Sequence, residues 1–322
     1  MKLINSLTLS LVVLLATGCR NNTTYPAEER GGYSRQQIGE LSKEYGPPVH
    51  LADLEDKAIR ESSGIVASHS NPDLFWTHND SGGGPILFAV DRRGRTQATW
   101  SVTGARAVDW EAIAIAPGTR PGSAFLYVGD IGDNSGRRRE IVVYRVPEPL
   151  VAPSGTATTK SAPQKTEPVE AIHLRYPDGK HDAESLAVHP ASGDLYVITK
   201  TRSMTTGAAV YKLTPPFSLS SVNTLKKVAD ISIPGLFPGM ITAADISPDG
   251  RKVIMCDYFN GFELNLSEGS GGFNDIWKEK IAIIRLGLRP QGEAICYRLD
   301  GRAIVATSEK RPARLIEVEL KH

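Results

Sequence analysis

The stretch "DAESLAVHPASGDLYVITKTRSMTTGAAVYKLTPP", residues 182–216, contains three short apolar runs separated by clusters of turn-forming residues. Apolar runs of four to eight residues bounded by Pro, Gly, Asp and Ser are typical of β-strands. The second run ends in the polar cluster "TKTR". The stretch therefore predicts three consecutive antiparallel strands with a polar loop after the second strand.

The same layout occurs five times along the chain, in repeats that start at Glu61, Asp109, Asp182, Thr242 and Gln291. Four of the five continue into a further strand-like run, such as "TQATWSV" or "KKVADISIP". Repeats of roughly fifty residues with four strands each are typical of a β-propeller. The repetition therefore favours a propeller over the other all-β option, a sandwich.

The fifth repeat contains only three strand-like runs, and a candidate for the missing strand precedes the first repeat. That candidate is "PVHLADLED", residues 48–56. Pairing the two in one blade closes the ring and leaves no open sheet edge. We therefore expect residues 48–322 to form an all-β domain, a five-bladed propeller with four-stranded blades. Six blades are the alternative, if a divergent blade lies within residues 145–180, where "PSGTATTKSAPQKTEP" is more typical of a surface insertion.

The N-terminus has the pattern of an export signal: Lys2, an apolar run at 7–15, and small residues that end at Cys19. The run is too short to span a bilayer. The small residues before the cysteine resemble the lipobox of bacterial lipoproteins, which implies removal of residues 1–18 and lipidation of Cys19. The alternative is an ordinary signal peptide with a chance cysteine. Residues 19–47 have little apolar periodicity and predict a flexible tether.

These features predict an exported lipoprotein of the cell envelope. The outer membrane or the cell surface is preferred, because Arg20 is not the aspartate associated with inner-membrane retention. Removing residues 1–18 leaves 36 basic and 36 acidic residues, since Lys2 is the only charged residue removed. A neutral chain has no electrostatic footprint for nucleic acid or for an anionic membrane. We expect a monomer held at the membrane through its lipid alone.

The two cysteines that follow Cys19 are Cys256 and Cys296, and both lie in apolar runs. So few cysteines exclude a disulfide scaffold in an exported chain of this length. We expect two buried free thiols, with a single disulfide as the alternative.

In a propeller the first strand of each blade lines the central channel. Aligning the repeats on their apolar alternation places one residue of each blade at the same height, and we call these the ring residues: Ser63, Glu111, Glu184, Ala244 and Glu293. Three carboxylates around one narrow channel cannot all stay ionised unaided, so they hold protons or a cation. Carboxylates and main-chain carbonyls favour calcium over zinc or copper. The alternative is that these acids accept hydrogen bonds from neighbouring strand starts.

The second strands end in polar clusters that should meet at the same end of the channel. The clusters contain His78, Asn79, Asp80, Asp130, Asp133, Asn134, Lys200, Arg202, Asp257, Tyr258, Asn260, Glu309, Lys310 and Arg311. Loops on a rigid scaffold are where binding residues collect. We predict a pocket at the channel mouth for a small molecule or an envelope protein. The alternative for each cluster is a β-turn, because Asn, Asp and Gly dominate such turns.

The order serine, glutamate, glutamate, small residue, glutamate at the strand starts is similar to that of the SdiA-regulated family of bacterial five-bladed propellers. The resemblance spans roughly residues 50–320 and is closest at "SSGIV", "DAESLAV" and "QGEAICYRLDGRAIVATSEKRPARLIEV". The calcium-dependent apyrases show the same order. The resemblance implies a central calcium held by Ser63, Glu111, Glu184, Ala244 and Glu293.

Two functions are supported by features of the sequence, and nothing in it favours a third, hydrolysis of a lactone or ester with a metal-bound water. One is a calcium-binding envelope protein without a catalytic role. The other is a calcium-dependent, apyrase-like hydrolase of phosphoanhydrides or phosphoesters, with Lys200 or Arg202 stabilising charge. Against the second, the linker "TWSVTGARAV" lacks the acid-rich segment that apyrases carry before their second blade. No G-x-S-x-G, H-E-x-x-H or P-loop motif is present, so serine-hydrolase, zinc-protease and P-loop chemistry have no support.

Overall fold

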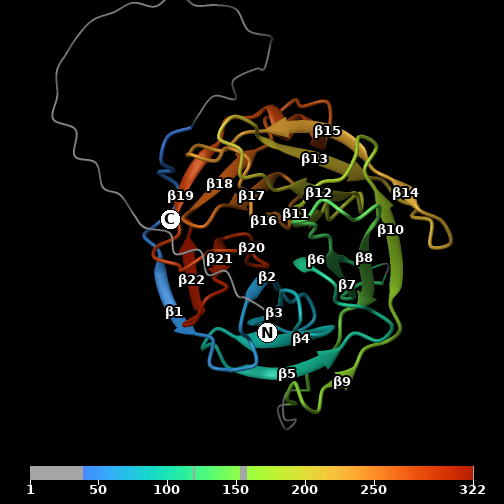
Figure 1. Ribbon diagram of the computed structural model, residues 1–322. Helices are drawn as coiled ribbons and strands as arrows, with labels where there is room; N and C mark the ends of the chain where they lie inside the picture. The colour runs from blue at the N-terminus through green and yellow to red at the C-terminus, as the bar shows by residue number, and fades with distance from the viewer. Residues whose placement is uncertain (1–38, 119, 153–157, 322) are drawn as a thin grey trace, which may run out of the picture. The chain divides into compact units, whose positions relative to one another are not determined.

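The computed structural model describes residues 39–321, except residue 119 and residues 153–157. These residues form five sheets arranged in a ring (Figure 1). The predicted signal peptide, Cys19 and residues 19–38 of the predicted tether lie outside the described residues. No helix in the described part of the chain has the length and apolar character needed to cross a membrane.

Each sheet is one blade, and the strands within a blade follow one another from the channel outward. The first blade contains β2 (Ser62–Ala67), β3 (Leu74–Asn79), β4 (Ile86–Asp91) and β5 (Thr96–Ser101). The second contains β6 (Trp110–Pro117), β7 (Ala124–Asp130), β8 (Ile141–Pro147) and β10 (Glu170–Arg175). The third contains β11 (Ala183–Val188), β12 (Leu195–Thr199), β13 (Ala208–Leu213) and β15 (Lys226–Ile231).

The fourth blade contains β16 (Ala243–Ile246), β17 (Lys252–Cys256), β18 (Asn260–Asn265) and β19 (Ala282–Arg285), with the 3₁₀ helix η1 (Phe273–Lys278) before its last strand. The fifth contains β20 (Ala294–Tyr297), β21 (Ala303–Thr307), β22 (Arg314–Glu319) and β1 (Val49–Asp53). The fold is thus a five-bladed β-propeller, as predicted.

The ring closes through the N-terminal strand. β1 pairs antiparallel with β22, in a register that places Val49 opposite Glu317 and Asp53 opposite Arg314. This pairing completes the fifth blade and confirms the closure predicted from residues 48–56. The strand itself is shorter than that segment.

The six-blade alternative is wrong, because the region 145–180 builds no separate sheet. Its strand β10 completes the second blade, and the two-residue strand β9 (Gln164–Lys165) adds in parallel to the outer edge of β5. A second short strand, β14 (Asn223–Thr224), adds in parallel to β10. Both extra strands lie on outer edges and leave the channel unchanged.

The folded unit begins before the predicted domain boundary at residue 48. Residues assigned to the tether pair with the propeller, because Leu41 bridges to Ile283 and Tyr45 bridges to Leu320. The Tyr45 hydroxyl donates to Glu263 Oε1 over 2.6 Å in a buried contact. Residues 39–47 therefore belong to the propeller, and a tether can only precede them.

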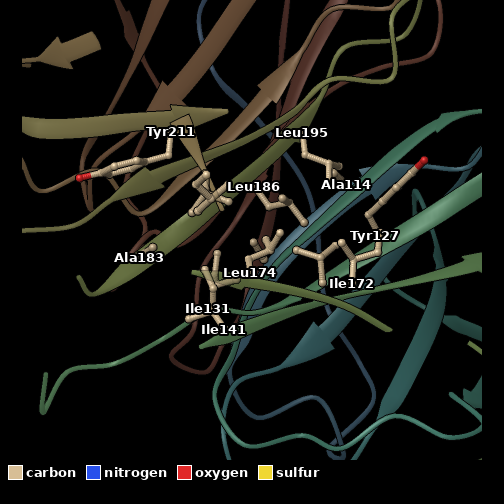
Figure 2. Close-up of a cluster of buried hydrophobic side chains, with 14 of the residues drawn as sticks. Ala114, Tyr127, Ile131, Ile141, Ile172, Leu174, Ala183, Leu186, Leu195 and Tyr211 are labelled. Carbon is tan, nitrogen blue, oxygen red and sulfur yellow. The ribbon is translucent and has the colours of Figure 1, made fainter. Parts of the chain in front are cut away.

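Five buried apolar clusters hold the blades together, one at each interface between neighbouring blades. Successive residues of one strand point to opposite sides: in β12, Leu195 and Val197 face the second blade, whereas Tyr196 and Ile198 face the fourth. Figure 2 shows the cluster between the second and third blades, where Leu174 of the second meets the third. Strands buried on both faces explain the continuous apolar runs in the sequence.

The prediction of two buried free thiols is confirmed for the described residues, since Cys256 and Cys296 are both buried and unpaired. Cys256 packs between the fourth and fifth blades, and Cys296 packs between the fifth and first. The two side chains therefore contribute to different apolar interfaces.

Candidate functional site

The ring residues lie at the starts of the five inner strands. Ser63, Glu111, Glu184 and Ala244 are the second residues of β2, β6, β11 and β16, and Glu293 directly precedes β20. All five are buried, with exposed fractions between 1% and 6%. The structure thus brings three buried glutamates to the same end of the inner strands.

A shared irregularity of the backbone explains why polar side chains occur at these buried positions. The pairing of β2 with β3 skips Ser63, that of β6 with β7 skips Glu111, and that of β11 with β12 skips Glu184. Each of the three is the extra residue of a β-bulge. A bulge takes one side chain out of the strand alternation and re-aims it.

Glu293 occupies an equivalent position. The carbonyl of Gln291 accepts a hydrogen bond from the Glu309 N–H over 3.0 Å, and Ala294 pairs with Thr307. Two residues, 292 and 293, therefore face the single residue 308. Ala244 differs, because β16 and β17 pair without a register shift there. Four ring residues are thus extra residues in the pairing of their strands, and the fifth, Ala244, is the one without a polar side chain.

Glu184 is paired with a lysine on the neighbouring strand. Lys200 follows β12 directly, and its Nζ contacts Glu184 Oε1. The ammonium also lies 5.9 Å from the centroid of the Tyr258 ring. Burial lowers the pKa of Lys200, and the charges of Glu293 and Glu111 oppose that shift. The second carboxylate oxygen of Glu184, Oε2, is buried and has no hydrogen-bond partner among the described residues.

Glu111 lies in a group of three acids with Asp80 and Asp109. One carboxylate oxygen of each lies within 4.8 Å of the others. The Glu111 and Asp109 carboxylates pack against the backbone of Gly132, where a Cβ would lie 2.6 Å from Glu111 Oε1 and 2.5 Å from Asp109 Oδ2. Burial, and then the charges of Asp80 and Asp109, raises the pKa of Glu111 to about 10. Burial also raises the pKa of Asp80 to about 6.

Glu293 and Glu309 are linked by the side-chain amide of Gln291. Gln291 Nε2 donates to Glu293 Oε1 over 3.2 Å and also to Glu309 Oε2. Ser63 Oγ donates to Glu309 Oε1 over 3.4 Å. Burial and the adjacent Glu293 carboxylate raise the pKa of Glu309 to about 9. The main chain of Gln291 has a φ of 57°, a left-handed conformation that costs a non-glycine residue about 1 kcal/mol or more.

Gln291 was not singled out as a site residue by sequence reasoning. Its only sequence signal is its place two residues before Glu293, where the second and third repeats carry Asp109 and Asp182. Gln291 and Asp109 were both missed because the alignment of the repeats considered the ring position alone and not the residue two places before it.

Of the other predicted pocket residues, His78 belongs to the core. It is fully buried, and its ring lies edge-on to Trp110 at a centroid distance of 5.8 Å. A Cβ at Gly64 would lie 2.6 Å from His78 Nε2, so the ring packs directly against β2. Burial lowers the pKa of His78 to about 4, which keeps the ring neutral at physiological pH.

Several predicted pocket residues hold loops through backbone groups. Asp133 and Asp257 do so within one turn, as the β-turn alternative expects. Asn79 and Asp130 instead join segments about twenty residues apart. Asn79 Oδ1 accepts from the backbone N–H of Arg60, and Asp133 accepts from those of Arg137 and Arg138. The remaining members of this group hold their own or neighbouring loops through backbone groups: Asp130, Asp257 and Arg311.

Arg202 is exposed and donates from NH1 to Asn134 Oδ1 over 3.2 Å, which joins the second and third blades. Tyr258 is half-buried, Lys310 is exposed, and Asn260 opens β18. Asp80, Lys200, Tyr258 and Glu309 are the predicted pocket residues that the structure brings close to the ring glutamates.

The opposite end of the inner strands encloses a small cavity of about 50 Å³. Every inner strand contributes to its lining, which includes Ala67, Ile115, Val188, Ile246 and Tyr297. Asp245 also lines it and accepts hydrogen bonds from the backbone N–H groups of Tyr297 and Ile246. Burial raises the pKa of Asp245 to about 7. The inner strands thus carry mainly apolar side chains at this end and acids at the other.

A larger cavity, of about 930 Å³, lies away from the ring residues. It is lined by 70–74, 91–93, Gln97 and 150–152. Most of these residues belong to the connections after β2, β4 and β8, whereas Leu74, Asp91 and Gln97 belong to β3, β4 and β5. It is therefore distinct from the pocket predicted at the channel mouth.

No protein-family model matches this chain, and no curated protein matches it. Solved structures do match, and one is the crystal structure of the β-propeller domain of Cps50 (Swd1) from Myceliophteria thermophila. The two chains are 11% identical with a TM-score of 0.45, and the match covers 84% of this chain and 99% of that one. The assignment of five blades rests on the sheet order and the closure of the ring described above.

Proposed function

We propose that this chain is a calcium-binding propeller of the cell envelope that presents the ring end of its channel to a ligand or a protein partner. The observation that carries the proposal is the buried ring itself. Glu111, Glu184 and Glu293 occupy equivalent positions in three blades and are buried at the same end of the inner strands, where Lys200 pairs with one of them. Buried carboxylates at this density require protons or a cation.

The donor set fits calcium. The ring supplies three carboxylates, the Ser63 hydroxyl and the Ala244 main-chain carbonyl, all of them oxygen donors, which is the coordination calcium prefers. The unpartnered Glu184 Oε2 is a buried acceptor that a cation would satisfy. A bound calcium would supply positive charge to these carboxylates and an open coordination position for an anionic group of a ligand.

The raised pKa values support the same assignment. With pKa values of about 10 for Glu111 and about 9 for Glu309, both carboxyls hold protons at neutral pH when no metal is bound. A divalent cation favours their ionised forms and releases those protons. The strand-start resemblance to SdiA-regulated propellers supports calcium as that cation, and the lipobox resemblance at Cys19 supports the envelope location.

Nothing in the described residues favours the hydrolase alternative. Lys200, one of the two cations that such chemistry would use, is paired with Glu184, and Arg202 is engaged with Asn134. Without bound metal, both charges are therefore directed at groups of this chain.

The test is thermal unfolding of the full chain with calcium and with a chelator. At a calcium concentration one hundred times Kd, binding stabilises the fold by about 2.7 kcal/mol. This corresponds to a rise in Tm of roughly 4–5 °C for a folded unit of about 280 residues. Glu184→Gln should remove most of the rise, whereas the exposed Glu268→Gln should keep it. A wild-type Tm that does not respond to calcium refutes the proposal.

A further inference from the structure

Lys200 places a positive charge inside the ring that is proposed to hold calcium. Its side chain is 2% exposed, and its Nζ contacts Glu184 Oε1. Within the part of the chain that the structure describes, this is the one ion pair made by a ring glutamate. Lys200 therefore balances part of the charge of the ring when no metal is bound.

The position of Lys200 also allows its ammonium group to move away from Glu184. It directly follows the last residue of β12, so its backbone lies at the mouth while its side chain reaches back to Glu184. A lysine side chain is a flexible four-carbon stem with a point charge at its end. The centroid of the half-buried Tyr258 ring lies 5.9 Å from the ammonium, which gives Lys200 a favourable contact besides Glu184, because an aromatic face attracts a cation.

We infer that Lys200 is a built-in counter-ion of the ring, which calcium must displace from Glu184, and that it thereby sets the calcium affinity of the site. This inference rests on the proposed calcium function. With the ammonium in place, Glu184 has one oxygen engaged and one free. A metal that takes both must break the ion pair. The affinity for calcium is then lower by the free energy of that pair, and the ring stays folded without metal.

The test substitutes Lys200→Met, which keeps most of the length of the side chain and removes its charge. The calcium affinity of the full chain is measured by titration calorimetry, and its stability by urea unfolding in chelator. The expected result is calcium binding at least about tenfold tighter, as for a typical coupling between two sites, together with a lower stability in chelator. Lys200→Met/Glu184→Gln should recover stability in chelator, because no unpaired buried charge remains.

A matched control lies on the same blade. Lys212 Nζ pairs with Asp194 Oδ2 over 3.1 Å and lies 6.0 Å from the Tyr196 ring centroid, the same arrangement away from the ring. Lys212→Met should leave calcium affinity unchanged. A gain of the same size in this variant would show a general charge effect and overturn the role of Lys200.

The outcomes separate this inference from the proposed function. If wild type binds calcium and Lys200→Met binds it equally or more weakly, the inference is overturned and the calcium function stands. If only Lys200→Met binds calcium, Lys200 is the resident cation of the ring, and the calcium function of the natural chain fails. If neither binds calcium, both are overturned.

Discussion

A single methyl group at Gly132 tests whether the Asp109 and Glu111 carboxylates pack as described. Gly132→Ala places a Cβ 2.5 Å from Asp109 Oδ2 and 2.6 Å from Glu111 Oε1, whereas ordinary contact begins at 3.4 Å. The backbone at Gly132 is not in the left-handed region, so alanine meets no conformational obstacle there. The two carboxylates must therefore move, and because they are the ends of side chains the cost lies at the lower end for overpacking, about 1 kcal/mol.

The displacement of Glu111 should also lower the affinity of the proposed site for calcium. The expected decrease is roughly 10- to 100-fold, as when a supporting contact is removed from other metal sites. Urea unfolding in chelator measures the first effect, and calorimetric titration with calcium measures the second. Gly272→Ala is the matched control, because nothing lies within 4 Å of the added Cβ. If Gly132→Ala matches the control in both measurements, the carboxylates do not occupy the positions on which the site was built.

Two further predictions concern buried polar groups of the first two blades, Glu148 and His78. Glu148→Ala should lower the free energy of unfolding, measured by urea titration, by about 2–6 kcal/mol. Buried donors such as Trp76 Nε1, which lies 2.8 Å from Glu148 Oε1, lose their acceptor in this variant. As a control, Glu268→Ala at an exposed position should change the free energy of unfolding by less than about 0.5 kcal/mol. His78 has a folded pKa of about 4 against an ordinary 6.5, so the unfolded chain alone takes up a proton as the pH falls through that window, and stability is lost. The stability advantage of wild type over His78→Gln should therefore shrink by about 3 kcal/mol between pH 7 and pH 4; a difference independent of pH would contradict the burial of a neutral ring.

The blades could be predicted from the sequence because their signal is repeated. A strand pattern such as "LYVIT" is ambiguous by itself, but five copies of one layout with the same turns define a periodic architecture. The closure of the ring could be predicted by counting strands. The last repeat has three strand-like runs, and the additional run near residue 50 supplies the fourth strand of that blade. The same alignment placed Glu111, Glu184 and Glu293 at equivalent positions, and the structure has them so.

What the sequence could not show depends on contacts between blades. A β-bulge adds one residue to one strand of a pair, so it is defined by the partner strand and leaves no local pattern at Glu184. The ion pair with Lys200 likewise depends on the register of β11 against β12. The attachment of residues 39–47 was missed because Tyr45 is a single apolar anchor whose partner, Glu263, lies in the fourth blade. Periodicity cannot detect one residue docked on a distant strand.

The closure of the fifth blade has a consequence for the order in which the protein folds. β1 is made first and β22 nearly last, so the pairing of Val49 with Glu317 cannot form until almost the whole chain is available. Contacts so distant in sequence form slowly, and an unpaired strand is exposed to wrong partners meanwhile. The composition of β1 is compatible with a long period without its partner strand, because most of its residues remain solvent-accessible even in the completed blade. β1 also carries His50 and the acid Asp53, whose Nε2 and Oδ1 atoms lie 2.8 Å apart, and a charged side chain on an edge discourages edge-to-edge association.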